Sequence, residues 1–341
     1  MKQFYVNSGP HIRSNITTRK IMLDVCIALI PSLIMGLVFF GGQAAFTVAI
    51  SIIGAILSEV VYKLCQRKKL STIVNEFDLT SLVTGLILGL VLPPLKYEHW
   101  YIPLLASIFA IVAVKMLFGG TGKNIVNPAV TGRIFAFIAF LSIVSSYFPN
   151  PQINTLSNTV VSGATPLTQF LKDGFNLGNV GVTNLDLLLG TGIAGSIGET
   201  CKVAIIVGYL YLSIKRVIKW QYPLIYIGVT GLMSVFMSGC DFNVFLPSIL
   251  SGGLMFGAVF MATDYVTSPV GTLAQYIYYI LLGVITGLLR FGTSIEVVSF
   301  AILLGNLIVP LLSIYFRPRH FGGKKFIEVI KEKLPKKKEG K

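Results

Sequence analysis

The residue best placed for covalent chemistry is a threonine, Thr165, in the segment Val161-Ser162-Gly163-Ala164-Thr165-Pro166-Leu167. Three small residues, Ser162, Gly163 and Ala164, precede it, and glycine lets a bulky group approach the backbone. The proline that follows fixes the turn that presents the hydroxyl. Because a threonine hydroxyl is a weak nucleophile on its own, a covalent group here needs a separate transferase. The plain alternative is a turn or a helix N-cap, where Ser and Thr are common.

A second polar run joins two apolar segments and reads Phe118-Gly119-Gly120-Thr121-Gly122-Lys123-Asn124-Ile125-Val126-Asn127-Pro128-Ala129. Its asparagines, Asn124 and Asn127, supply amide donors and acceptors, and Pro128 can start the next helix. Such a loop could hold the edge of a flat cofactor ring or line an ion path. The alternative is a connecting turn with capping asparagines. The run does not fit a phosphate loop, because Asn124 follows the lysine where Ser or Thr is required.

An acidic residue, Asp264, directly follows an apolar run in Phe260-Met261-Ala262-Thr263-Asp264-Tyr265-Val266-Thr267-Ser268-Pro269. A carboxylate at membrane depth costs about 2.5–3.5 kcal/mol on insertion scales, so it usually has a partner or a function. We expect Asp264 to bind sodium, to hydrogen-bond a cofactor or to pair with Arg133. An interfacial N-cap in water is the alternative.

A second acidic residue, Glu199, lies in the most irregular part of an apolar segment, Gly195-Ser196-Ile197-Gly198-Glu199-Thr200. Sodium prefers hard oxygen donors, and unwound backbone carbonyls can complete its shell. A sodium path through Glu199 and Asp264 is therefore a hypothesis. For the other acidic residues near apolar segments, a structural or interfacial role is the simpler interpretation; these are Asp24, Glu59, Asp78 and Glu296.

The composition is that of a polytopic membrane protein. Of the 341 residues, 54% are hydrophobic and only 12% are charged, which is unlike a large soluble domain. The net charge of +14 lies between apolar runs and in the C-terminal tail, where contacts with anionic membrane lipid explain it. Nucleic acid is not an expected partner, because no basic stripe alternates with exposed aromatic residues.

Cysteine and histidine patterns argue against a metal centre built by this chain alone. The four cysteines are far apart and form no C-x-x-C pair, so an internal iron–sulfur cluster or zinc site is not expected. The three histidines lie outside the apolar runs, which leaves no facing pair for an intramembrane haem. A redox cofactor would therefore be organic or belong to a partner.

The apolar runs predict an all-α polytopic membrane protein with about ten transmembrane helices. A bilayer core about 30 Å thick needs about 20 helical residues. Runs of this kind lie at 21–40, 44–64, 79–95, 100–118, 129–148, 187–213, 221–238, 243–262, 273–290 and 296–316. The sixth contains several glycines between 190 and 198, so we expect a broken or re-entrant segment there.

The basic residues predict the orientation. With the N-terminus inside, all but four of the 28 Lys and Arg residues fall on or near the cytoplasmic side, the exceptions being Lys96, Lys172, Lys202 and Arg290. This distribution obeys the positive-inside rule. It predicts a multi-pass protein of a bacterial or archaeal cell membrane, with both termini cytoplasmic and the loop that carries Thr165 on the outer face.

The two halves look related. Gly85-Leu86-Ile87-Leu88-Gly89 matches Gly253-Leu254-Met255-Phe256-Gly257, and Leu117-Phe118-Gly119-Gly120-Thr121 is echoed by Arg290-Phe291-Gly292-Thr293. Five spans per half is an odd number, so a duplication would produce two inverted five-helix repeats. The expected organisation is a cytoplasmic N-terminus (1–20), a first membrane repeat (21–148), an outer loop with the attachment motif (149–186), a second repeat (187–316) and a basic cytoplasmic tail (317–341).

The three motifs together resemble the NqrB/RnfD family, and the resemblance extends over nearly the whole chain. The segment around Thr165 resembles the family's flavin-attachment motif, in which the threonine is joined to FMN through a phosphoester. The run 118–129 resembles its G-G-T-G-x-N-x-x-N-P-A loop. The run 260–269 resembles its F-M-A-T-D-P-V signature, with Tyr265 in place of proline. The short stretch before the first span is more similar to RnfD than to NqrB.

The resemblance implies a membrane complex, the Rnf complex, that oxidises reduced ferredoxin and reduces NAD⁺ while moving Na⁺ or H⁺ outward. This chain would be a subunit of that translocase and would relay electrons without catalysing the reaction alone. The implied cofactors are covalent FMN at Thr165 and a second, non-covalent flavin (riboflavin or FMN). The implied partners are a flavin transferase and the other subunits (A, B, C, E and G). We expect further cofactor contacts from Asn124, Asn127, Arg133 and Asp264.

Two other functions stay open on the sequence alone. One is a redox-free transporter or channel built from inverted repeats, and the other is a membrane scaffold that only assembles partners. The long motif-bearing loop favours the flavin protein. The lack of an obvious polar pair in the span centres weakens the transporter alternative.

Overall fold

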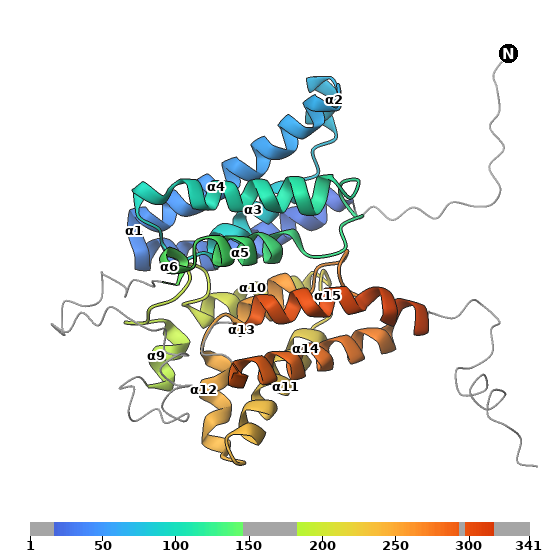
Figure 1. The fold of residues 1–341 in the computed structure, drawn as a ribbon. Helices are drawn as coiled ribbons and strands as arrows, with labels where there is room; N and C mark the ends of the chain where they lie inside the picture. Colours follow the sequence, from blue (N-terminus) through green and yellow to red (C-terminus); the bar gives the residue numbers. More distant parts are fainter. Residues whose placement is uncertain (1–16, 146–182, 293–296, 317–341) are drawn as a thin grey trace, which may run out of the picture.

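The computed structural model describes residues 17–145, 183–292 and 297–316, and every regular element in these ranges is helical (Figure 1). The first half contains α1 (Thr18–Cys65), α2 (Leu70–Asn75), α3 (Thr80–Val91), η1 (Tyr97–His99), α4 (Tyr101–Ile108), η2 (Phe109–Met116), α5 (Pro128–Ala139) and α6 (Leu141–Val144). The second half contains α9 (Asn184–Leu189), α10 (Lys202–Ile214), α11 (Gln221–Met237), η3 (Phe242–Val244), α12 (Phe245–Leu250), α13 (Leu254–Phe256), η4 (Gly257–Met261), α14 (Thr272–Gly292) and α15 (Val298–Tyr315).

The two halves form two layers that pack against each other. Figure 1 shows α1, α3, α4 and α5 in one layer and α11, α14 and α15 in the other. The layers meet mainly where α1 contacts α10 and where α5 contacts α15. The prediction of an all-helical polytopic architecture is confirmed for the described part of the chain, while the repeat boundaries and the inverted relation of the halves stay predictions.

The long helix α1 covers the first two predicted spans. It is two helices joined at Gly41, whose backbone (φ 60°, ψ −139°) is not helical, and Figure 1 shows the chain reversing direction along α1. Glycine adopts a positive φ without a steric penalty. The break therefore falls where the sequence places the boundary between two spans.

The sixth and the eighth predicted spans are broken, and the sequence predicts only the break in the sixth. The sixth is interrupted as expected, because α9 and α10 are separated by a non-helical stretch with positive φ at Gly190 and Gly192. For the eighth span, the prediction of one continuous helix over 243–262 is wrong, since the helical segments Phe242–Leu250 and Leu254–Met261 are bent by 68° relative to each other. The bend lies at Ser251–Gly253, where Ser251 is extended and Gly252 has φ 66°.

Span lengths vary. Among the described residues, four helical stretches are long and apolar enough to cross a membrane, and the bent pair adds a fifth. These are Thr18–Cys65, Tyr97–Met116, Thr272–Gly292 and Val298–Tyr315, with shorter apolar helices at α3, α5, α10 and α11. The total of ten spans stays a prediction.

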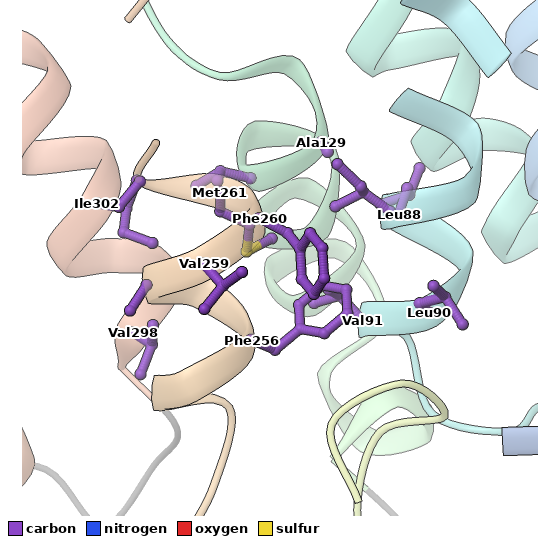
Figure 2. Close-up of a cluster of buried hydrophobic side chains, with 14 of the residues drawn as sticks. Leu88, Leu90, Val91, Ala129, Phe256, Val259, Phe260, Met261, Val298 and Ile302 are labelled. Carbon is purple, nitrogen blue, oxygen red and sulfur yellow. The ribbon is translucent and has the colours of Figure 1, made fainter. Parts of the chain in front are cut away.

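An apolar core fills the space between the halves. Figure 2 shows Leu88, Leu90 and Val91 of α3 facing the side chains of α13 and η4, with Val298 and Ile302 of α15 on the far side. The rings of Phe256 and Phe260 lie 5.0 Å apart between their centroids. All of these side chains are buried, so the two layers share one core.

Close helix contact depends on glycine at Gly208 of α10. A Cβ atom there would lie 2.4 Å from the carbonyl oxygen of Ala28 in α1 and 2.9 Å from the ring of Phe260. Small residues of this kind let helices approach in lipid, where hydrophobic burial does not drive association.

We therefore predict that Gly208→Ala lowers the free energy of unfolding by about 1–3 kcal/mol, the usual effect of overpacking. Gly228→Ala in α11 is the matched control, because a Cβ atom there has nothing within 4 Å. The control should be neutral, or stabilising by up to about 1 kcal/mol through helix propensity. Thermal unfolding of both variants in detergent micelles measures the difference, and equal melting temperatures would contradict the packing argument.

Candidate functional site

A cavity of about 380 Å³ lies between the two halves, and residues of two of the three sequence motifs line it. Its walls come from the start of α1, from α3, from the loop before α5, from the end of α10 and from the end of η4 and the link that follows. Most of the lining is apolar. The polar groups include Asn124 and Asn127 from one motif and Asp264 from another. The structure thus brings together three of the predicted site residues.

Asn127 begins α5 and also joins the two halves. Its Oδ1 accepts hydrogen bonds from the backbone N–H groups of Ala129 (3.0 Å) and Val130 (3.4 Å), and Pro128 occupies the first helical position. Its Nδ2 donates to the carbonyl oxygen of Met261, at the end of η4, over 3.1 Å. The capping role that the sequence left open is therefore correct, and the same residue lines the cavity.

Asn306 of α15 extends this connection. With its amide oriented to satisfy both polar atoms, it accepts from the backbone N–H of Asn127 (3.1 Å) and donates to the carbonyl of Thr267 (3.3 Å) and the hydroxyl of Tyr278 (2.8 Å). Asn306 is fully buried. The two motif loops are thus fixed to each other and to α15 by hydrogen bonds.

Asp264 lies in the link after η4. Its Oδ2 accepts from the hydroxyl of Thr267 over 3.0 Å. Burial raises the pKa of Asp264 above its usual value, and hydrogen bonds from Thr267 and from backbone N–H groups oppose that rise. The predicted pairing of Asp264 with Arg133 is wrong, because the guanidinium of Arg133 bonds Glu199 and Ser299 instead. Arg133 lies well inside α5, whereas Asp264 faces the cavity at the helix ends.

The cavity also contains a lysine that the sequence analysis missed. Lys115, only 3% exposed, lines the cavity and pairs with Oε2 of Glu59 at 2.9 Å. It also donates to the hydroxyl of Thr80 over 2.5 Å. The available signal was a lone charge inside the predicted span 100–118, since a charge at membrane depth is expensive and usually functional.

A chain of hydrogen bonds continues from Lys115 to the adjoining loops. Thr80 donates to Oδ1 of Asp78 (2.5 Å), and Thr121 of the first motif loop donates to Oδ2 (2.8 Å). Burial alone would raise the pKa of Asp78, but the hydrogen bonds from Thr80 and Thr121 outweigh burial and lower it. Asp78 is thereby kept ionised and orients the loop around Thr121.

Helical segments of the wider, π type lead into both motifs. η2 (Phe109–Met116) ends just before the loop of Asn124, and η4 (Gly257–Met261) ends just before Asp264. Such segments are frequent at functional sites, because the extra residue per turn shifts the side chains that follow.

A second polar cluster lies where the two broken spans meet. Arg133 of α5 bonds Oε1 of Glu199 (3.2 Å) and the hydroxyl of Ser299 in α15 (3.0 Å). Arg133 and Glu199 are 7% and 3% exposed. The break before α10 is further fixed by its backbone, because Gly198 N–H donates to the carbonyl of Leu90 over 2.7 Å.

Two more buried cations satisfy carbonyl groups at the bend between α12 and α13. Arg290 of α14 donates to the carbonyls of Ser248 (2.7 Å) and Ser251 (3.2 Å). Lys202 of α10 donates to the carbonyls of Glu199 and Gly252. Cations near a helix C-terminus stabilise its unpaired carbonyls. The sequence placed both residues on the outer side and missed this role.

The predicted residues are thus divided between two places. Asn124, Asn127 and Asp264 share the large cavity, whereas Arg133 and Glu199 form the buried pair at the helix breaks. The four residues of the attachment motif, Ser162, Gly163, Ala164 and Thr165, lie outside the described residues.

These features define a polytopic helical membrane protein with a ligand-sized cavity and buried charges at broken helices. The chain belongs to the NQR2, RnfD, RnfE family, which matches residues 5–322. It is 39% identical over 321 residues to the D subunit of the Na⁺-translocating ferredoxin:NAD⁺ oxidoreductase complex of Acetobacterium woodii, with 93% of this chain and 95% of the relative covered.

Other relatives agree. The chain is 32% identical to the D subunit of the proton-translocating ferredoxin:NAD⁺ oxidoreductase complex of Clostridium ljungdahlii, covering 94% of this chain and 96% of the relative. It is 30% identical to the D subunit of the ion-translocating oxidoreductase complex of Aliivibrio salmonicida, covering 94% and 99%. The family resemblance inferred from the motifs is confirmed.

We predict that breaking the buried pair is far more damaging than breaking an exposed one. Arg133→Met leaves the Glu199 carboxylate buried without that partner and should lower the free energy of unfolding by about 3–5 kcal/mol. Lys68→Met, which removes the exposed pair with Glu76 (3.0 Å), should cost at most about 1 kcal/mol.

Thermal unfolding in detergent compares the two variants. Adding Glu199→Leu to Arg133→Met should recover part of the loss, because it removes the negative charge that Arg133 balanced. A double variant that is less stable by the sum of its single effects would show that the two residues act independently.

Proposed function

We propose that this chain is the flavin-carrying membrane subunit of an ion-translocating ferredoxin:NAD⁺ oxidoreductase complex. Relatives that match over nearly their whole length are named as the D subunit of such complexes. The observation that supports the flavin most directly is the meeting of the two motif loops in one cavity of about 380 Å³. Cofactor sites are typically concave, about 300–1,000 Å³ in volume and mostly apolar, with a few converging polar groups.

The lining of the cavity suits an isoalloxazine ring. The apolar walls from α1, α3 and η4 suit the flat face of the ring, and the polar groups among the lining residues suit its hydrogen-bonding edge. Lys115 uses two of its three N–H donors on Glu59 and Thr80 within the described part of the chain. The third is then suited to a ring carbonyl, while the carboxylate of Asp264 can accept from the ring imide N–H. Asn124 can supply a further amide contact.

A flavin exchanges one or two electrons when bound, and the protein supplies position, insulation and electrostatic tuning. Here the apolar walls exclude water from the ring face. Lys115 places a positive charge in the wall of the cavity, and its ion pair with Glu59 reduces the net charge there. Such a charge favours the flavin form that has gained electrons. Hydrogen bonds between Asn127, Met261 and Asn306 keep the two walls at a fixed separation.

The second flavin in this proposal is FMN joined through its phosphate to Thr165 by a flavin transferase. Sequence orientation puts that loop on the outer face, with both termini and the cavity end of α1 on the cytoplasmic face. Electrons would then pass between a flavin near one membrane surface and a flavin near the other. The remaining subunits (A, B, C, E and G) would deliver and collect them, and anionic lipid would contact the basic loops.

Ion translocation is part of the proposal, with Glu199 and Asp264 as candidate groups on the path. These two carboxylates line different cavities, so a path that uses both must pass the apolar core around Phe256 and Phe260 (Figure 2). Relatives named for sodium and for protons are both similar to this chain, which leaves either ion as the cargo.

A redox-free transporter is the second candidate. The observation that favours it is the pair of helix breaks with buried charges, because transporters built from inverted repeats bind their substrates at such breaks. The ligand-sized cavity at the two motif loops favours the flavin protein over this alternative.

We predict that Thr165→Ala abolishes covalent flavin in this chain. The wild-type band should fluoresce in a denaturing gel when the chain is expressed with its transferase, and the variant band should be dark. Ser162→Ala is the matched control, since it keeps the acceptor hydroxyl and should retain at least part of the fluorescence. A dark wild-type band, in a host that flavinylates another protein, would contradict the covalent FMN.

We predict that non-covalent flavin is lost when either charged residue of the cavity lining, Lys115 or Asp264, is neutralised. In a Thr165→Ala background, Lys115→Met or Asp264→Asn should each weaken flavin retention about ten- to a hundredfold, because a hydrogen bond to a charged group contributes about 1.5–3 kcal/mol. Flavin released by acid and quantified per chain is the measurement. Lys68→Met, the same substitution as Lys115→Met but at a surface position, should retain the full amount. Unchanged flavin in both cavity variants would remove the cavity from the proposal.

A further inference from the structure

A second, much smaller cavity of about 30 Å³ lies where the break before α10 meets the bend between α12 and α13. Its polar lining consists of Ser196, Glu199, Thr200, Lys202, Ser251 and Gly252. This volume admits a water molecule or a single dehydrated monovalent cation, but no organic ligand. The large cavity and its motif loops contribute no residue to it.

One polar atom in this small cavity has no partner among the described residues. The hydroxyl oxygen of Ser196 is buried, with the residue 1% exposed, and makes no hydrogen bond to any residue that the structure describes. Buried hydroxyl groups in native proteins are nearly always bonded to protein, water or an ion. Because Ser196 lines the cavity, its hydroxyl oxygen is a candidate ligand for a water molecule or an ion there.

The oxygen atoms around the cavity are of the kind that bind an alkali cation. Lys202 donates to the carbonyl oxygens of Glu199 and Gly252, the second at 2.9 Å. These carbonyls belong to unwound backbone at the two breaks, which is where Na⁺ finds its ligands in transporters with broken helices. Hard carbonyl and hydroxyl oxygens suit such an ion. In this structure the ammonium of Lys202 holds the carbonyls that a metal ion would use.

The charges around the small cavity favour a single positive charge in it, either the Lys202 ammonium or a cation. The Glu199 carboxylate is paired with Arg133 at 3.2 Å, and it packs so closely on Gly253 that a Cβ atom there would lie 2.3 Å from Oε1. A Na⁺ ion beside the ammonium of Lys202 would face strong repulsion at low dielectric. A Na⁺ ion in place of that ammonium would leave the local charge unchanged.

We propose that this small cavity is a monovalent-cation site in which the ammonium of Lys202 competes with the ion. Ser196 Oγ and the carbonyls of Glu199 and Gly252 are the ligands, and Lys202 must withdraw before a cation enters. The proposal deepens the ion-translocating part of the proposed function, because it names the site, its ligands and the residue that controls occupancy.

The test uses the full chain purified in detergent, with NaCl compared with choline chloride at equal ionic strength. Lys202→Met should show a melting temperature that rises with NaCl and saturates, because the cation replaces the missing ammonium. Wild type should respond much less, since its site is already filled. Lys96→Met, the same change at an exposed lysine, should behave like wild type.

The ligand assignment is tested by a double variant. Lys202→Met with Ser196→Ala should need at least several-fold more NaCl for the same rise, because one ligand is gone. The proposal is overturned if Lys202→Met gains nothing from NaCl, which would mean that only water occupies the cavity. It is also overturned if the double variant responds as strongly as the single one.

The test stays decisive even if a variant fails to fold. If Lys202→Met cannot be recovered folded, Lys202→Gln replaces it, and failure to recover either variant in NaCl also counts against the site, since Na⁺ should substitute for the ammonium. None of these measurements requires flavin. A sodium response in a chain that carries no flavin would contradict the electron relay and support the cation site. Flavin in a chain that shows no sodium response would support the electron relay and contradict the cation site.

Discussion

The buried ion pair between Arg133 and Glu199 holds the two halves together at the break before α10. Backbone N–H and C=O groups there lack the hydrogen-bond partners that a continuous helix supplies. A membrane interior offers no water to unpaired carbonyl or amide groups, so non-helical backbone is tolerated only where protein groups bond it. Here the break before α10 is held by Arg133 and by the backbone of α3, and the bend after α12 by Lys202 and Arg290. With these cations removed, both breaks would expose unsatisfied polar groups to an apolar core.

An apolar layer separates this polar region from the ligand-sized cavity. Phe260 lines the large cavity, whereas the ring of Phe256 lies against Gly198 of the break, 3.2 Å from where a Cβ atom would stand. The two rings pack on each other and on α3 (Figure 2). In the functions proposed here, electron transfer and ion binding would occupy separate places in one chain. Coupling between them would require movement of α13 and η4, because these segments carry the two rings and η4 leads into the link that contains Asp264.

The sequence predicted the class, the helical architecture and three of the polar residues that line the cavity, for physical reasons that are local. Asn127 before Pro128 signals a helix start, Asp264 at the end of an apolar run signals a costly charge, and the glycines at 190–198 signal a break.

The bend in the eighth span was missed because Ser251–Gly253 is short and its flanks are apolar, so hydropathy does not reveal the bend. The partner of Arg133 was mistaken because residues of distant segments meet only in the folded chain. Lys115 and Lys202 both lie inside predicted spans and were overlooked, because only the tertiary contacts with Glu59 and Gly252 reveal their roles.

The central claim is that this chain carries two flavins, one covalent and one held in the cavity. The most direct test is the intact mass of the chain purified from its own host, measured first denatured and then under native conditions. The account predicts a denatured mass above the 37.1 kDa of the sequence by one FMN phosphoryl group, and a native mass larger by one further flavin. A chain that shows only the sequence mass in both measurements would contradict the account.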